Sequence, residues 1–98
     1  MTRSEVGDEK AAMRRFELQW SRSWPDRSHD FSAFDRELLV GRIHRLTGGP
    51  AGDRWSWSML ALVGNRQATE TGIADDRDAA CLQVERNYRV FRQRIGGA

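Results

Sequence analysis

The chain has 98 residues, of which 16 are basic and 14 acidic, so its formal net charge is only +2 at pH 7. This length fits one domain, and the pI of about 9.3 is a mild basic bias that does not mark a polyanion-binding protein. The single cysteine, Cys81, excludes an internal disulfide bond and a metal site built from cysteines.

Arginine supplies nearly all of the basic charge, because the chain has 15 arginines and one lysine, Lys10. The planar guanidinium fork suits recognition of phosphates and carboxylates. Acidic residues are interleaved with these arginines, however, and GC-rich genes encode arginine in preference to lysine. We therefore favour genome composition over a binding role as the origin of the high arginine content.

The N-terminal stretch MTRSEVGDEK is charged and contains no apolar run. We therefore expect a cytoplasmic protein that is neither exported nor membrane-spanning. Residues 1–13 are polar and are predicted to form a flexible N-terminal segment. Residues 14–98 are then a single α+β domain.

Residues 14–22 leave two alternatives open. Phe16, Leu18 and Trp20 alternate with polar residues, which is typical of a strand. Met13, Phe16 and Trp20 also fit one face of a helix. We favour the strand, which Pro25 would end.

Alternating apolar and polar residues predict an antiparallel sheet over the middle of the chain. Glycine and proline in TGGPAGD, residues 47–53, predict a hairpin loop between two long strands. The predicted strands are DFSAFD (30–35), LLVGRIHRL (38–46) and RWSWSMLALV (54–63), followed by a further edge strand, QATETGI (67–73).

The C-terminal segment has the periodicity of a helix. Three aspartates lie between residues 75 and 78, and Arg92 and Arg94 lie near the other end, which matches the helix dipole. The apolar stripe consists of Ala80, Val84, Tyr88, Phe91 and Ile95. The predicted fold class is therefore α+β, an antiparallel sheet of three to five strands with one long C-terminal helix packed on one face.

Trp55 and Trp57 are either core residues or a stacking platform for nucleic-acid bases. If Trp57 pairs with Ile43, its face also carries Gly41 and Leu39 and is apolar, whereas pairing with His44 makes that face half cationic. We favour the core, because the apolar stripe of the helix needs an apolar sheet face to cover it.

Residues for covalent or metal chemistry do not gather in this sequence. GGPAGD lacks the Lys-Ser/Thr of a phosphate-binding loop, and His29 and His44 are the only histidines. No histidine lies near Cys81 in the sequence, which argues against a nucleophilic thiol. We expect a protein that is not an enzyme and that holds neither a metal nor a cofactor.

We expect a small non-catalytic binding or regulatory protein that acts through a protein partner or by self-association. A regulator, an accessory subunit and a mobile-element-encoded inhibitor all fit this size. The candidate contacts are Trp24 and three residues of the predicted solvated sheet face, Arg42, His44 and Arg54.

The alternative function is nucleic-acid binding through Arg86, Arg89 and Arg92 on the helix, together with the sheet surface that carries Arg42 and Arg54. The three helix arginines follow one side of the predicted helix at intervals of three residues. Glu85 lies four residues before Arg89 and neutralises part of this charge.

Two resemblances bear on the fold. The order of three strands and a helix is similar to that in double-stranded-RNA-binding domains, and TGIADDRDAACLQVERNY (71–88) matches the glycine-then-alanine spacing that enters that family's last helix. That family grips phosphates with lysines at the start of this helix. Here residues 75–78 read Asp-Asp-Arg-Asp, which would repel phosphate, so we do not expect binding to RNA duplexes in that mode.

The chain also resembles short uncharacterised alphaproteobacterial proteins over residues 24–95. Their pattern joins a Gly-Arg-Ile strand, a tryptophan-rich strand and an alanine-rich helix, and it matches Gly41 to Ile43, Arg54 to Ser58 and Ala74 to Ala80. No function is assigned to those proteins. The resemblance therefore implies a single-domain fold and carries over no functional residue.

Overall fold

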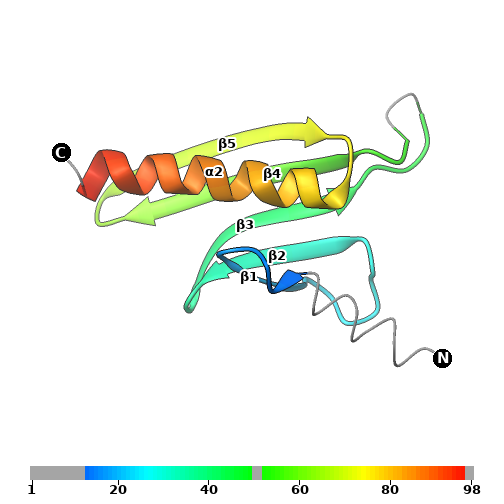
Figure 1. Cartoon of the computed structure of the whole chain (residues 1–98), viewed down its shortest axis with the longest axis horizontal. Coiled ribbons are helices and arrows are strands. Elements are labelled where there is room, and N and C mark those ends of the chain that lie inside the picture. The colour runs from blue at the N-terminus through cyan, green and yellow to red at the C-terminus, as the bar shows by residue number, and fades with distance from the viewer. Residues whose placement is uncertain (1–12, 50–51, 97–98) are drawn as a thin grey trace.

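The structure is a computed structural model that describes residues 13–49 and 52–96. Five strands form one antiparallel sheet in chain order, and the final helix lies across one face of it (Figure 1). The elements are β1 (Gln19–Arg22), β2 (Asp30–Asp35), β3 (Leu38–Arg45), β4 (Trp55–Val63), β5 (Arg66–Ala74) and α2 (Arg77–Gly96). The predicted α+β fold, with a long C-terminal helix on one sheet face, is confirmed.

The segment before β1 belongs to the core. Within residues 14–22, where the sequence permits a strand or a helix, residues 19–22 form β1, which pairs with β2. Residues 1–12 of the predicted flexible segment lie outside the described residues, whereas Met13 is buried. The structured part of the chain therefore includes at least Met13.

Two-residue turns join β2 to β3 and β4 to β5. The first turn is Arg36-Glu37 and the second is Gly64-Asn65, and the first residue of each has a positive φ, 59° at Arg36 and 63° at Gly64. Such turns have the twist that neighbouring antiparallel strands require. They hold the two hairpins in the registers that place the apolar residues on one face.

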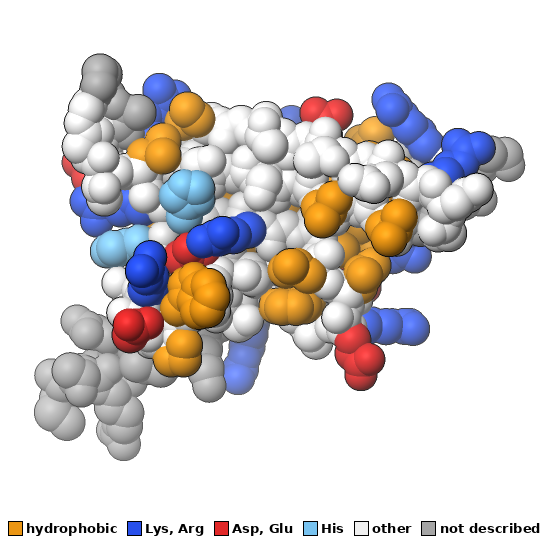
Figure 2. Space-filling model, turned by 180° about the vertical axis from the view of Figure 1, so that it is seen from behind, with side chains coloured by type: hydrophobic (Ala, Val, Ile, Leu, Met, Phe, Trp, Pro, Cys, Tyr) orange, Lys and Arg blue, Asp and Glu red, His pale blue; other side chains and the backbone are white. Residues whose placement is uncertain are grey.

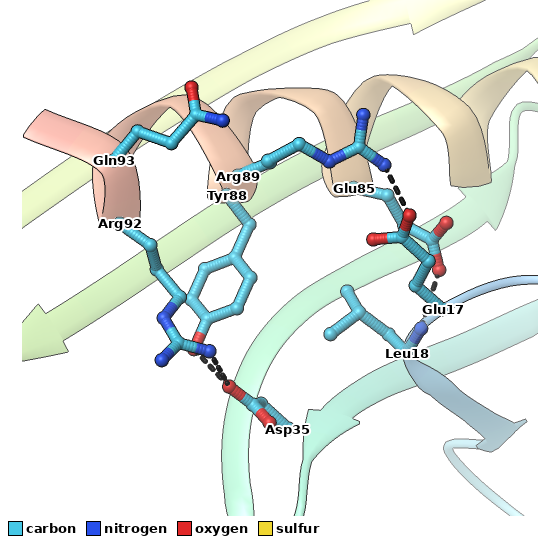
Figure 3. Close-up of a pocket in the computed structure, with 8 residues that line it drawn as sticks. All are labelled: Glu17, Leu18, Asp35, Glu85, Tyr88, Arg89, Arg92 and Gln93. Carbon is cyan, nitrogen blue, oxygen red and sulfur yellow. Dashed lines mark hydrogen bonds and ion pairs between the residues drawn. The ribbon is translucent and has the colours of Figure 1, made fainter. Parts of the chain in front are cut away.

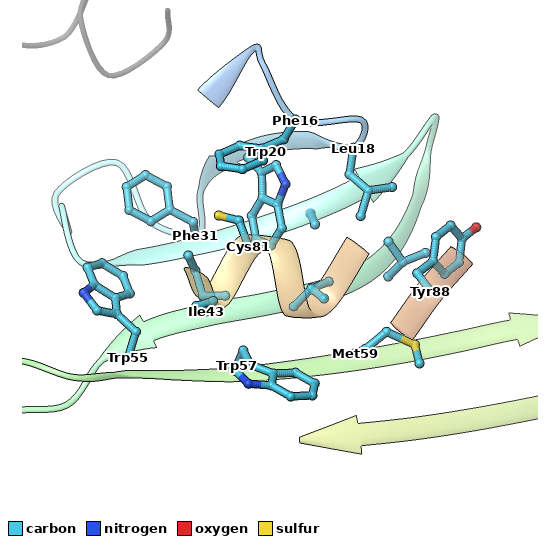
Figure 4. Close-up of a cluster of buried hydrophobic side chains, with 14 of the residues drawn as sticks. Phe16, Leu18, Trp20, Phe31, Ile43, Trp55, Trp57, Met59, Cys81 and Tyr88 are labelled. Atoms are coloured by element: carbon cyan, nitrogen blue, oxygen red, sulfur yellow. The ribbon is translucent and has the colours of Figure 1, made fainter. Parts of the chain in front are cut away.

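The tryptophans of β4 are core residues, as predicted. Ile43 lies opposite Trp57, so Trp55, Trp57 and Met59 all point toward α2 and are at most 8% exposed (Figure 4). From the helix, Ala80, Val84 and Tyr88 are buried against them. The apolar stripe of α2 is therefore covered by the sheet face expected from the sequence.

One predicted core residue lies on the other face. Leu39 was expected beside Gly41 and Ile43, but it is 48% exposed. The register between β2 and β3 shifts between Ala33 and Phe34, so Val40 is an extra residue in β3 and is fully buried. This β-bulge turns Val40 inward and Leu39 outward.

Two glycines allow close packing against the sheet. A Cβ atom at Gly41 would lie 2.5 Å from Cγ1 of Val84, and one at Gly72 would lie 2.6 Å from Cζ2 of Trp57. Both distances are far below van der Waals contact. Gly41 therefore gives α2 its close approach to β3, and Gly72 provides the space in which the Trp57 indole lies over β5.

A buried carboxylate attaches the first strand to the helix. Oε2 of Glu85 accepts hydrogen bonds from the backbone N–H of Leu18, at 2.7 Å, and from the indole N–H of Trp20, at 3.1 Å. Glu85 is 5% exposed. Because both donors are buried, this one oxygen satisfies polar groups that would otherwise be left without partners.

At the start of α2, the side chain of Asp76 accepts a hydrogen bond from the backbone N–H of Ala79 at 2.8 Å. This is the geometry of a helix N-cap, and it accounts for one of the three aspartates expected at this end. The side chain of Ile95, the last member of the predicted apolar stripe, lies outside the described residues.

We expect Gly72→Ala to lower the free energy of unfolding by about 1–3 kcal/mol, because the added methyl group overlaps the indole of Trp57. Urea unfolding measures this loss. Trp57→Ala alone should lower stability by about 3–5 kcal/mol. In the Trp57→Ala background the Gly72→Ala change should have no further destabilising effect, and a full additive loss would contradict the contact.

We expect Glu85→Ala to lower the free energy of unfolding by about 2–4 kcal/mol, because two buried donors lose their acceptor. Glu85→Gln keeps a carbonyl oxygen at this place, so it should retain more than half of the unfolding free energy that Glu85→Ala loses. Urea unfolding of both variants tests the assignment. Equal losses for alanine and glutamine would show that the hydrogen bonds are not what Glu85 contributes.

Candidate functional site

The open face of the sheet is the side that α2 leaves uncovered. The pairing registers place alternate residues of all five strands on it. Figure 2 shows one group of hydrophobic side chains toward the end where the two hairpins turn, and it shows histidine, basic and acidic side chains together with further hydrophobic side chains at the opposite end. We call these two regions the apolar end and the polar end of the open face.

An ion pair is the centre of the polar end. The guanidinium of Arg42 in β3 binds the carboxylate of Asp30 in β2 in a two-pronged contact, with Nε donating to Oδ1 at 2.9 Å and Nη2 donating to Oδ2. Asp30 is 5% exposed, whereas the Arg42 side chain is 51% exposed. Asp30 thus fixes the orientation of a guanidinium group that remains open to solvent.

This ion pair shifts the pKa of both partners. The hydrogen bonds from Arg42 hold the pKa of Asp30 below its ordinary value of 3.8, although burial of the carboxylate acts in the opposite direction. The carboxylate of Asp30 raises the pKa of Arg42. Both groups are therefore charged at neutral pH.

His44 and two serines complete the polar end. His44 lies directly opposite Asp30 in the register and is exposed. Ser58 lies opposite Arg42, and its hydroxyl donates to the Arg42 carbonyl oxygen at 3.4 Å. Ser56 lies opposite His44. This end therefore offers a fixed cation, an imidazole and hydroxyl groups side by side.

Leucines form the apolar end. Leu39, Leu60 and Leu62 are 48%, 45% and 52% exposed, respectively. Leu39 lies opposite the partly buried Phe34, and Leu60 and Leu62 follow one another on alternate positions of β4. Several half-exposed large side chains on one face are more than scattered surface hydrophobics.

Of the four residues predicted for partner binding, the pairing registers place two on this face. Arg42 and His44 are neighbours at the polar end, as expected. Trp24 belongs to the connection between β1 and β2 and is 53% exposed. Arg54 precedes β4 and forms an ion pair of 3.4 Å with Asp75, beyond the end of β5.

The arginines predicted for nucleic-acid binding are partly neutralised. Arg89 binds Glu17 at 2.6 Å, and Arg92 binds Asp35 at 3.1 Å. Glu17 raises the pKa of Arg89. Arg86 is exposed and has no ion-pair partner within the described ranges.

A hollow of about 530 Å³ lies between the C-terminal half of α2 and the segment around β1 and β2 (Figure 3). Its walls hold the two ion pairs of Arg89 and Arg92 and the buried carboxylate of Glu85. Tyr88 donates a hydrogen bond of 2.6 Å from its hydroxyl to Asp35. Burial and this contact raise the pKa of Tyr88 to about 12.

The charged groups of this hollow are already paired with one another. A charged ligand would have to displace Glu17 from Arg89 or Asp35 from Arg92 in order to bind there. Each displacement would replace one ion pair by another of similar strength, so the hollow favours a structural role. It connects the helix to β2 and to the segment before β1.

The described residues include no arrangement suited to metal binding or thiol chemistry. No group of three histidine, cysteine or acidic side chains in residues 13–49 and 52–96 is placed to hold a metal ion. Cys81 is fully buried, and burial raises the pKa of its thiol far above the ordinary value. Nor does any helix in this part of the chain combine the length and apolar character needed to cross a membrane.

No protein-family model, curated protein or solved structure matches the chain. The side chains themselves are therefore the basis for proposing a function. Arg42 and His44 on the open face were predicted from the sequence as candidate contacts, whereas Leu60 and Leu62 were missed. Their alternation with Trp57, Met59 and Ala61 was the signal, because it places both leucines on the solvated side of β4.

We expect Asp30→Asn to destabilise the protein at neutral pH and to have progressively less effect in acid. The pKa of Asp30 is lowered in the folded state, so its contribution is present above pH 3.8 and is lost as the pH falls through the folded-state value. Melting temperatures of wild type and variant from pH 7 to pH 2 check this. A gap between them that stays constant over the whole range would contradict the role of the ion pair.

Proposed function

We propose that the protein is a non-catalytic binding protein whose open sheet face engages a protein partner. The observation that carries this proposal is the group of half-exposed leucines at the apolar end, Leu39, Leu60 and Leu62. Contact with a partner would remove their apolar surface from water, which stabilises a complex by roughly 25 cal/mol for each Å² buried. Regulation or inhibition of that partner is the role we propose.

The polar end supports a specific contact beside the apolar one. Arg42 is held in place by Asp30 and still has half of its side chain exposed, so it can donate to a second acceptor without losing further side-chain freedom. Protein interfaces combine an apolar centre with arginine and polar groups around it. The acceptor on the partner would be a carboxylate or a backbone carbonyl group.

The nucleic-acid alternative has less support. Arg89, Arg92, Arg42 and Arg54 are each paired with a carboxylate, so phosphate binding would have to compete with four existing ion pairs. Arg86 alone does not make a basic stripe. We therefore place the function on the open face of the sheet and not on the helix.

Site-specific photo-cross-linking in the cells that make the protein tests the open face. A photoreactive amino acid at position 60 should cross-link to a protein partner. The matched control is position 82 on the outer side of α2, where Leu82 is 56% exposed. We expect the partner from position 60 and not from position 82.

The affinity for the captured partner then measures the contribution of the leucines. Leu60→Lys should weaken binding roughly tenfold or more, a loss of about 1.4 kcal/mol, whereas Leu82→Lys should leave it unchanged. A partner captured equally from both positions would refute the open-face site. So would binding to DNA or RNA that weakens steeply with salt and is lost in Arg86→Glu.

A further inference from the structure

The outer edge of β5 is an unpaired strand edge. β5 is the last strand of the sheet, and no segment in the described part of the chain pairs with its outer side (Figure 1). It has nine residues, whereas β1 at the opposite edge has four. Its backbone therefore presents a row of N–H and C=O groups to solvent.

The turn between β4 and β5 determines which groups face outward. Val63 and Arg66 flank this two-residue turn and form the first hydrogen-bonded pair. Hydrogen-bonded and non-hydrogen-bonded pairs then alternate along the hairpin. The outward N–H and C=O groups accordingly belong to alternate residues, Gln67, Thr69, Thr71 and Ile73.

Protein sheets usually protect such an edge with proline, lysine, a bulge or a covering segment. β5 contains neither proline nor lysine, and its register with β4 continues without a shift from Val63–Arg66 to Trp55–Ala74. Its charged residues are Arg66 and Glu70, which both lie on the α2 side of the sheet. A long and regular edge of this kind is a template for another strand.

We propose that β5 pairs antiparallel with β5 of a second copy of this chain, with the two-fold axis at Ala68. In this register Arg66 of each copy lies opposite Glu70 of the other, and Gln67 lies opposite Thr69. The charges of the edge are thus self-complementary, as a two-fold interface requires. Opposite charges directly across a strand pair stabilise it.

A second antiparallel register of the two β5 strands is less favourable than the one centred on Ala68. In this second register, all four outward-facing residues of one copy would form hydrogen-bonded pairs with the four outward-facing residues of the other copy. The two-fold axis would then lie at Glu70 and would place two glutamates directly opposite each other. Like charges in that position destabilise a strand pair. Shifting the axis by two residues to Ala68 converts this repulsion into two ion pairs, while Thr71 and Ile73 keep their contact with water.

The helices leave room for such a dimer. α2 lies over β3, β4 and β5 and is centred on β4. In the dimer the two β4 strands are three strand spacings apart, or roughly 14 Å. Packed helices approach to about 8–10 Å, so the second helix does not clash with the first. The result is one continuous ten-stranded sheet with both open faces on the same side.

Sedimentation equilibrium of the full chain, over a range of concentrations, tests the dimer. The wild type should shift from 11.3 kDa to twice this mass as the concentration rises. Thr69→Pro removes an outward N–H without removing a bond to β4, and should weaken dimerisation at least roughly tenfold, while Thr69→Ser should not. A monomeric wild type at all concentrations, or an unaffected dimer in a folded Thr69→Pro protein, overturns the proposal.

Charge exchange tests the register. Glu70→Arg places two arginines opposite each other and should abolish the dimer, and Arg66→Glu combined with Glu70→Arg should restore it at low salt. Tighter association of Glu70→Thr than of the wild type would overturn the Ala68-centred register. This dimer does not depend on the proposed partner, so Leu60→Lys should leave the dimer intact. A dimer that is lost in Leu60→Lys but retained in Thr69→Pro would overturn the edge contact.

Discussion

Ile43 lies opposite Trp57, and this pairing assigns the side chains of β4, and those of β3 from Gly41 to Arg45, to the two faces of the sheet. Because the side chains of a strand alternate, a slip of one residue between β3 and β4 would put Arg42 and His44 on the same face as the tryptophans. The apolar stripe of α2 matches only the observed register. The helix, the core and the open face therefore depend on the same pairing.

Carboxylates connect the helix to the part of the chain that this pairing does not reach. Glu85 accepts hydrogen bonds from Leu18 and Trp20, and Asp35 accepts from Tyr88 and Arg92. These contacts hold the N-terminal segment and the end of β2 against α2. The short β1 is therefore held by a hydrogen bond to the helix in addition to its pairing with β2.

Regular periodicity made most of the fold predictable. The alternation of Trp55, Trp57 and Met59 indicated β4, and the spacing of Ala80, Val84 and Tyr88 indicated α2. The bulge at Val40 was not predictable, because LLVGRI contains apolar residues at successive positions and permits either Leu39 or Val40 to point inward. Packing against the rest of the core decides between them.

The candidate site was predictable in its polar half only. With Ile43 paired to Trp57, the alternation of side chains along β3 predicted Arg42 and His44 on the solvated face, where they lie. The ion-pair partners of the arginines could not be predicted from the sequence. Arg89 binds Glu17, which is 72 positions away in the chain, and a contact over such a separation produces no periodicity in the sequence. Only the folded arrangement shows which positive charges are already neutralised.

The order of the elements also has a consequence for synthesis of the chain. All five strands are neighbours in sequence and in the sheet, so each hairpin can form as soon as its second strand has left the ribosome. The element that covers Trp55, Trp57 and Met59 comes after all of them. Until α2 is made, the nascent sheet exposes its whole apolar face to water or to a chaperone, and completion of the helix buries that face.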